Sequence, residues 1–345
     1  MRKYKLLSIK NIALVVLVAV MAVIPLIVKG NYIISIFVSC LIFASLGSAW
    51  NIIGGYGAQI SWCHSAFVTI GAYSNFILSV NFGISPFLSM PIGMLISFIF
   101  ATIIGHGTFK LRGAYFSIAT IAFAESLRIA IQYFDKLTKG AAGIYVTYTG
   151  SSFSKLTFKN DIPFYYIALV LLILIVIIIY RFTKSKTGHY LGAIKGNEDA
   201  AESLGIEAFK VKLTAFQLSA IFTSVIGAIY GSYLTYIAPS STCGFDLSIK
   251  IGVVAIVGGI GTIAGPIIGA FIFIPLIEIA SKLLGQIGGS QMLYGLLLII
   301  IVIFRPEGVV SLFKRKSKKD DVVGETAKIN EETKNGQGRK ENKNG

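Results

Sequence analysis

Long apolar segments alternate with short polar ones along most of the chain, and this pattern predicts a bundle of membrane-spanning helices. Most apolar segments reach about 18 residues, the length at which a helix crosses a bilayer. A transmembrane β-barrel would show shorter segments of alternating hydrophobicity. We therefore expect an all-α polytopic membrane protein of about ten spans, at residues 11–28, 32–53, 64–80, 86–107, 114–134, 163–180, 213–238, 248–260, 263–284 and 291–304.

Two glycine-rich segments interrupt this pattern. The first break, residues 54–57, reads GGYG, and the second break, residues 258–261, reads GGIG. Irregular backbone at membrane depth is tolerated only inside protein or beside a water-filled cavity. We predict broken or re-entrant helices here, placed as in transporters that arise from internal repeats. A loop at the cytoplasmic surface and a chance likeness of two glycine-rich segments are the alternatives.

Polar residues near the first break and inside the later spans are candidates for a translocation path. Glu125 lies deep in the span 114–134 with Arg128 three residues later, so it either faces a cavity or is neutralised by Arg128 on its own helix. His64 has no accompanying ligands for metal binding or catalysis. The predicted path residues are Gln59, Ser61, His64, Tyr73, Tyr115 and Glu125.

The largest polar segment, residues 181–212, stands between two apolar spans and contains its own helix signals. We call it the charged loop. Asn197 is a predicted N-cap, Glu198 and Asp199 suit the positive first turn, and Gly205 suits the helix end. Ala200 and Ala201 lie four and three residues before Leu204, so the three are expected to share a small apolar face. Such a face predicts close approach by a partner protein.

The distribution of charge predicts the orientation and the domains. Of the 31 basic residues, 23 lie in the segments that an inside N-terminus places in the cytoplasm, and five lie in the opposite connections. Cytoplasmic loops carry such an excess, so both termini are expected in the cytoplasm of a multi-pass cell-membrane protein. We expect a transmembrane domain over residues 1–312 and a disordered charged tail over 313–345, which lacks hydrophobic periodicity.

Composition supports a membrane protein and argues against other classes. The chain is 54% hydrophobic and 14% charged, where soluble domains carry about a quarter charged residues. The net charge of +15 reflects the cytoplasmic loops and tail and does not indicate nucleic-acid binding. Cys40, Cys63 and Cys243 lack metal-ligand spacing and are expected to be small buried hydrophobes. Residues 11–28 have no cleavage site before Lys29, so we expect a retained span.

Several motifs, in order along the chain, resemble the permease subunit of branched-chain amino acid ABC transporters. Residues 188–206 are similar to the family's cytoplasmic loop, with Lys195-Gly196 in place of the family's Arg-Glu. Beside the first break, Ala58 stands where the family pattern usually has glycine. The segment around the first break matches the family pattern at Asn51, Gly55, Tyr56, Gln59, Ser61, His64, Ala66, Phe67, Gly71, Ala72 and Tyr73.

The resemblance implies a permease that imports branched-chain or related amino acids. It implies a second permease subunit, an extracytoplasmic substrate-binding protein and two ATPase subunits that dock on residues 188–206 and bind the ATP. The chain has no phosphate-binding loop of the form G-x-x-x-x-G-K-[ST], so we expect no ATPase site of its own, no catalytic residue and no cofactor. A permease for urea or short amides, an ion-coupled secondary transporter that uses Glu125 or Glu278, and a scaffolding protein remain alternatives.

Overall fold

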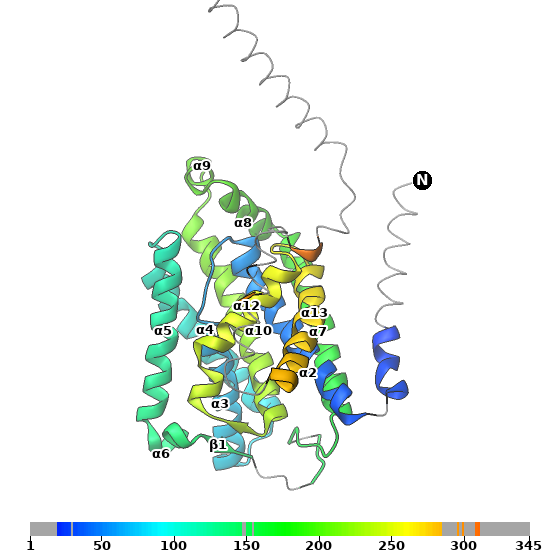
Figure 1. Ribbon diagram of the computed structural model, residues 1–345. Helices are drawn as coiled ribbons and strands as arrows, with labels where there is room; N and C mark the ends of the chain where they lie inside the picture. Colours follow the sequence, from blue (N-terminus) through cyan, green and yellow to red (C-terminus); the bar gives the residue numbers. More distant parts are fainter. Residues whose placement is uncertain are drawn as a thin grey trace, which may run out of the picture. The chain divides into compact units, whose positions relative to one another are not determined.

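The computed structural model describes residues 19–28, 30–146, 150–153, 155–284, 295–296, 299 and 308–310. The chain divides into two units, Met1–Val309 and Val310–Gly345, and the architecture below belongs to the first. The predicted tail, residues 313–345, lies outside the described residues. Helices standing side by side form nearly all of the described chain (Figure 1). The prediction of an all-α polytopic membrane protein is therefore confirmed.

The helices begin and end close to the boundaries that hydrophobicity predicts. A two-stranded antiparallel sheet pairs Ile144 with Ile237 and Tyr145 with Tyr236. The elements, in chain order, are α2 Asn31–Asn51, η1 Ile52–Tyr56 (a π-helix), α3 His64–Phe82, α4 Pro86–Thr108, α5 Ala114–Tyr133, α6 Asp135–Thr138, η2 Gly140–Ala142 (a 3₁₀-helix), β1 Ile144–Tyr145, α7 Ile162–Thr183, α8 Lys186–Gly196, α9 Glu198–Ser203, α10 Ala208–Leu234, β2 Tyr236–Ile237, α11 Pro239–Thr242, α12 Phe245–Gly258 and α13 Ala264–Leu284.

Seven helical segments of the described chain are long and apolar enough to cross a membrane. They are Asn31–Tyr56, Pro86–Thr108, Ala114–Tyr133, Ile162–Thr183, Ala208–Leu234, Pro239–Gly258 and Ala264–Lys282. The predicted span 64–80 is a helix, α3, but it carries buried polar residues such as Asn75 and is not among the seven. The structure describes only residues 19–28 of the predicted span 11–28, and most of the predicted span 291–304 lies outside the described residues, so the count of ten is not confirmed.

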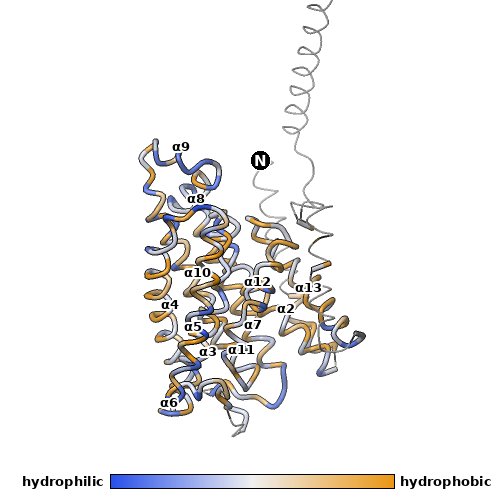
Figure 2. The backbone as a smooth tube through the Cα atoms, turned by 60° about the vertical axis from the view of Figure 1, so that its left-hand side comes forward, coloured by the Kyte–Doolittle hydropathy of each residue, from blue (hydrophilic) through white to orange (hydrophobic). Residues whose placement is uncertain are grey.

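The helix α10 lies at the centre of the bundle, where it packs against α2, α3 and α4. A Cβ added at Gly71 of α3 would lie 1.9 Å from the Ser224 carbonyl oxygen, and one added at Gly227 of α10 would lie 2.4 Å from the Val68 oxygen. Small residues therefore let the α3 and α10 backbones touch, as is usual between membrane helices. Hydrophilic residues gather on α8 and α9 at one end of the bundle (Figure 2).

Both glycine-rich breaks lie where a helix ends. The first break lies in η1 and the residue after it, and the second lies between α12, which ends at Gly258, and α13, which begins at Ala264. The segment 57–63 turns back alongside α2, because the Trp50 Nε1–H donates a hydrogen bond to the Ser61 carbonyl at 2.7 Å. Re-entrant insertion into a bilayer stays a prediction.

Candidate translocation and coupling sites

The charged loop folds into two short helices, each preceded by a side-chain cap. The Ser185 Oγ accepts a hydrogen bond from the Gly188 N–H at 3.2 Å before α8. The Asn197 Oδ1 accepts one from the Ala200 N–H at 3.0 Å before α9, which confirms the predicted N-cap. Gly205 follows α9 with a φ of +83°, a conformation that glycine adopts readily. The sequence analysis missed α8, although a serine three residues before Gly188 was a usable signal.

The apolar face predicted on α9 is only partly present. Ala201 is 3% exposed within this chain, whereas Leu204 is 83% exposed and Ala200 is also exposed. The reason is local: α9 ends at Ser203, and the Ile206 N–H donates to the Ala201 carbonyl as the chain reverses. The prediction that Ala201 shares an exposed face with the other two is therefore wrong. A partner would meet Ala200 and Leu204.

Two ion pairs connect α9 to other parts of the chain. The Lys212 Nζ lies 2.5 Å from the Glu198 Oε1, and Lys212 is only 1% exposed. The Arg112 Nη2, in the connection between α4 and α5, lies 2.7 Å from the Asp199 Oδ1. This exposed guanidinium holds the pKa of the Asp199 carboxyl below its usual value, chiefly through the hydrogen bond. Sequence analysis assigned both acids only to the helix dipole and missed these distant partners.

Asn51, the last residue of α2, ties the two breaks together. Its Oδ1 accepts a hydrogen bond from the Gly261 N–H at 2.8 Å, and its Nδ2 donates to the Thr262 carbonyl at 2.8 Å. A Cβ added at Gly55 would lie 1.8 Å from this Oδ1 and 2.6 Å from the Gly261 nitrogen. The similar glycine-rich sequences thus meet at one point, which their separation along the chain does not reveal.

The predicted path residues fall into two groups. Ser61, His64 and Tyr73 are buried inside this chain. The His64 Nε2 lies 2.8 Å from the Ser219 Oγ, which itself donates to the Ala49 carbonyl at 2.7 Å. Because the serine hydrogen is used on that carbonyl, His64 is the donor in this pair.

The remaining three, Gln59, Tyr115 and Glu125, reach the surface of the chain. Gln59 is half-buried, Tyr115 is 74% exposed and the Glu125 side chain is 47% exposed. The structure does not bring all six residues together around one cavity within the described chain.

The helix α5 presents an unusual surface for a membrane span. It stands at the edge of the bundle (Figure 1), and little of it is buried. Tyr115, Ile118, Ala122, Glu125 and Ile129 follow one another at helical spacing along its outer side. We call these five residues the α5 stripe.

Glu125 on this stripe is not a free charge. The Arg128 guanidinium is bonded to both Glu125 carboxylate oxygens, and its side chain is half-buried. Charged groups at this depth are costly in hydrocarbon even when they are paired. The α5 stripe is therefore better suited to protein or water than to lipid.

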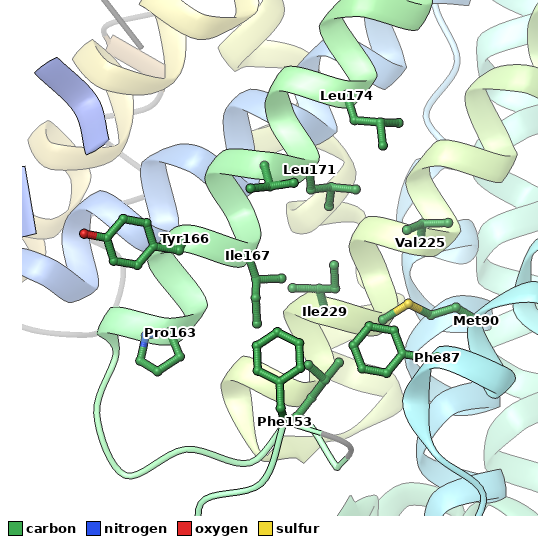
Figure 3. A pocket seen from close by; sticks show the side chains of 12 residues that line it. Phe87, Met90, Phe153, Pro163, Tyr166, Ile167, Leu171, Leu174, Val225 and Ile229 are labelled. Carbon is green, nitrogen blue, oxygen red and sulfur yellow. The ribbon is translucent and has the colours of Figure 1, made fainter. Parts of the chain in front are cut away.

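One cavity among the described residues has a different character. It has a volume of 510 Å³ and lies between α4, α7 and α10 (Figure 3). Its lining is almost wholly apolar and includes Phe87, Met90, Phe153 and Val225. Tyr166 turns its hydroxyl away from the other side chains and donates to the Ala22 carbonyl at 3.1 Å. A zwitterionic solute would find no polar partner there, so this cavity does not suit a polar cargo.

These features define a class: a multi-pass, all-α membrane protein with a capped helical loop at one end and a charge pair in one span. The chain belongs to the family described as "Branched-chain amino acid transport system / permease component", whose pattern matches residues 32–302. Members of this family are membrane permeases of ABC transport systems, and the expected resemblance is thereby confirmed.

Individual relatives agree with the family. The chain is 26% identical to the high-affinity branched-chain amino acid transport system permease protein LivM of Salmonella typhimurium, over 83% of this chain and 72% of that protein. It is 26% identical to the probable permease protein LivH of Methanocaldococcus jannaschii, over 75% and 85%. A shorter match, 28% identical, covers 36% of this chain and 40% of the ribose import permease protein RbsC of Escherichia coli K12. No solved structure matches.

Proposed function

We propose that this chain is the membrane permease subunit of an ATP-driven importer and that ATPase subunits dock on residues 188–206. One observation carries this proposal: α9 is a capped helix that exposes a small residue, Ala200, beside a large apolar one, Leu204. An isolated exposed leucine is ordinary, but here it accompanies a helix anchored by two ion pairs. An exposed apolar side chain on a positioned helix suits insertion into a groove of a soluble partner.

The same proposal places the charged loop and both termini in the cytoplasm, where ATP is available. The partner subunits would bind and hydrolyse the ATP. The excess of basic residues on this side of the membrane supports this orientation. A second permease subunit and an extracytoplasmic binding protein would complete the importer, as in relatives named as parts of transport systems.

The translocation path would run along the α5 stripe, between this chain and the second permease. Glu125 and Arg128 offer one group of each charge at membrane depth, and Tyr115 and Gln59 add polar groups toward the charged loop. The segment just after the first break contacts α5, because the Ser117 Oγ donates to the Ile60 carbonyl at 2.7 Å. Ser61, His64 and Tyr73 would then support the path from behind rather than line it.

Branched-chain amino acids are the proposed cargo, because the relatives that match most of the chain are named for that transport. The test is reconstitution of the chain with the proteins that co-purify with it from its native host. ATP-dependent uptake of leucine, isoleucine and valine is expected in these vesicles. Preference for urea or ribose would change the cargo, and uptake driven by an ion gradient without ATP would refute the importer.

A further inference from the structure

Lys195, near the end of α8, reaches the first break. Its ammonium donates a hydrogen bond to the Gly55 carbonyl at 2.7 Å. The π-helix η1 ends at Tyr56, so a carbonyl in its last turn needs a donor from outside the helix. Lys195 supplies that donor from the charged loop, 140 positions further along the chain.

The same ammonium lies beside the second break. It is 3.0 Å from the position that a Cβ on Gly261 would occupy, and Gly261 has a φ of +73°. Gly261 is also the residue that donates its N–H to Asn51. Lys195 therefore stands where the two breaks and the end of α2 meet.

A second contact shows that α8 rests on this part of the fold. Leu191 of α8 is fully buried, and its Cδ1 lies 3.3 Å from the position of a Cβ on Gly57. Only Asn197 separates α8 from α9, so a displacement of α9 is passed to α8 through a short, capped connection. An apolar contact such as that of Leu191 resists compression, whereas a hydrogen bond also holds under separation and fixes direction.

The breaks are suited to yield to such a displacement. A single π-helical turn is uncommon and often occurs at functional sites, and η1 lacks the regular hydrogen bonding of the α-helix before it. Glycines at Gly55, Gly259 and Gly261 allow backbone movements that other residues resist. Asn51 directly precedes η1 and is hydrogen-bonded to Gly261 and Thr262, so it connects the first break to the second.

We propose that Lys195 is a positioning residue that couples the charged loop to the two glycine-rich breaks, so that movement of the docked ATPase opens or closes the path. This inference rests on the proposed docking of an ATPase on the loop. It concerns the transmission of movement and not the docking itself. The prediction is that loss of the ammonium separates ATPase binding from transport.

The test compares Lys195→Met with Lys195→Arg, which keeps a donor, and with Lys186→Met. Lys186 lies on the same helix and faces the Tyr190 ring, so its replacement removes the same charge elsewhere. We expect all three variants to co-purify the ATPase. In reconstituted vesicles, uptake per ATP hydrolysed should fall about tenfold in Lys195→Met, the factor that one lost charge-assisted hydrogen bond commonly represents. The two control variants should stay near wild type.

A conformational readout that needs no cargo completes the test. Ala58 is exposed beside the first break, so Ala58→Cys, with Cys40, Cys63 and Cys243 replaced by alanine, reports on the break through its maleimide labelling rate. In the otherwise wild-type chain this rate should change on addition of a non-hydrolysable ATP analogue. With Lys195→Met, the labelling rates with and without the analogue should be about equal, because the loop no longer biases the break.

Three outcomes would overturn the inference. The first is wild-type uptake per ATP hydrolysed in Lys195→Met. The second is a labelling rate at Ala58→Cys that still changes with the ATP analogue in that variant as it does in the otherwise wild-type chain. The third is loss of ATPase binding in Lys195→Met, which would make Lys195 part of the docking surface. Failure of the wild-type chain to bind any ATPase would instead refute the proposed function, so the two failures are distinguishable.

Discussion

Glu198 and Lys212 form an ion pair of 2.5 Å that joins the first residue of α9 to the first turns of α10. Lys212 is almost fully buried, while Glu198 keeps partial access to solvent. A buried ammonium without a partner is costly, whereas replacing both partners of such a pair can be nearly neutral. The pair therefore contributes to the position of α9, and with it to that of the exposed Leu204.

The first prediction tests this pair. Glu198→Gln should lower the free energy of unfolding by about 2–3 kcal/mol, because it leaves the Lys212 charge buried and unpaired. The double variant Glu198→Gln, Lys212→Met should recover most of that loss. Thermal unfolding of the purified protein in detergent measures both. Equal stability of the single and double variants would show that the buried charge is not the cause.

The second prediction tests the docking surface. Leu204→Arg and Ala200→Arg place a charge on the exposed side of α9, so the chain should fold normally while ATPase recovery falls at least about tenfold. Ala201→Arg differs, because Ala201 is buried within this chain. That variant should destabilise the charged loop itself. Co-purification of the ATPase, measured beside the unfolding temperature, separates the two effects.

Full ATPase recovery in both exposed-site variants would refute docking at α9. Ser203→Arg serves as a control, since Ser203 is exposed at the end of the same helix. It should reduce recovery less than Leu204→Arg does, provided that the leucine side chain enters the groove.

The third prediction concerns the path. Glu125→Gln keeps the shape of the side chain but leaves Arg128 without its carboxylate. Uptake should fall at least about tenfold, the effect typical of a lost charged contact, while ATPase binding is unchanged. Ser126→Ala is the control, because it removes a neighbouring polar group of α5 whose Oγ donates only to the Ala122 carbonyl of its own helix, and it leaves the Glu125–Arg128 pair intact. Normal uptake in Glu125→Gln would place the path elsewhere.

The fourth prediction concerns backbone strain at the first break. Ala58 has a φ of +53°, in the left-handed region that glycine adopts more readily than alanine. A left-handed conformation costs an alanine about 1–2 kcal/mol, which the greater freedom of unfolded glycine partly offsets. Ala58→Gly should therefore raise the free energy of unfolding by up to about 1 kcal/mol. A lower unfolding temperature would mean that the methyl group makes a contact that outweighs the strain.

The fifth prediction concerns orientation. Single cysteines at the exposed positions Ser151 and Glu202, on a background without the three native cysteines, report on the two ends of the bundle. An impermeant thiol reagent should label Ser151→Cys in intact cells and spare Glu202→Cys until the membrane is opened. The opposite pattern would reverse the proposed orientation and remove the charged loop from the cytoplasm.

Much of the local structure was determined by the sequence alone. Apolar runs of bilayer length predicted the spans within a few residues, as for α4 and α13, because hydrophobic length and backbone satisfaction leave few other structures in a membrane. Side-chain capping predicted α9 at Asn197, since a cap bonds only to its own helix end. The buried state of Cys40, Cys63 and Cys243 was likewise predicted from their apolar surroundings.

The tertiary structure alone decided which distant residues meet. Asn51 joins the two glycine-rich breaks, Lys195 reaches the first of them, and Lys212 is buried against Glu198. Helical periodicity gave Ala201 and Leu204 a common face, but the chain reversal after α9 buried one and exposed the other. Hydrophobic pattern and capping act over a few residues of chain, whereas these contacts depend on how helices pack across the bundle, which no local pattern encodes.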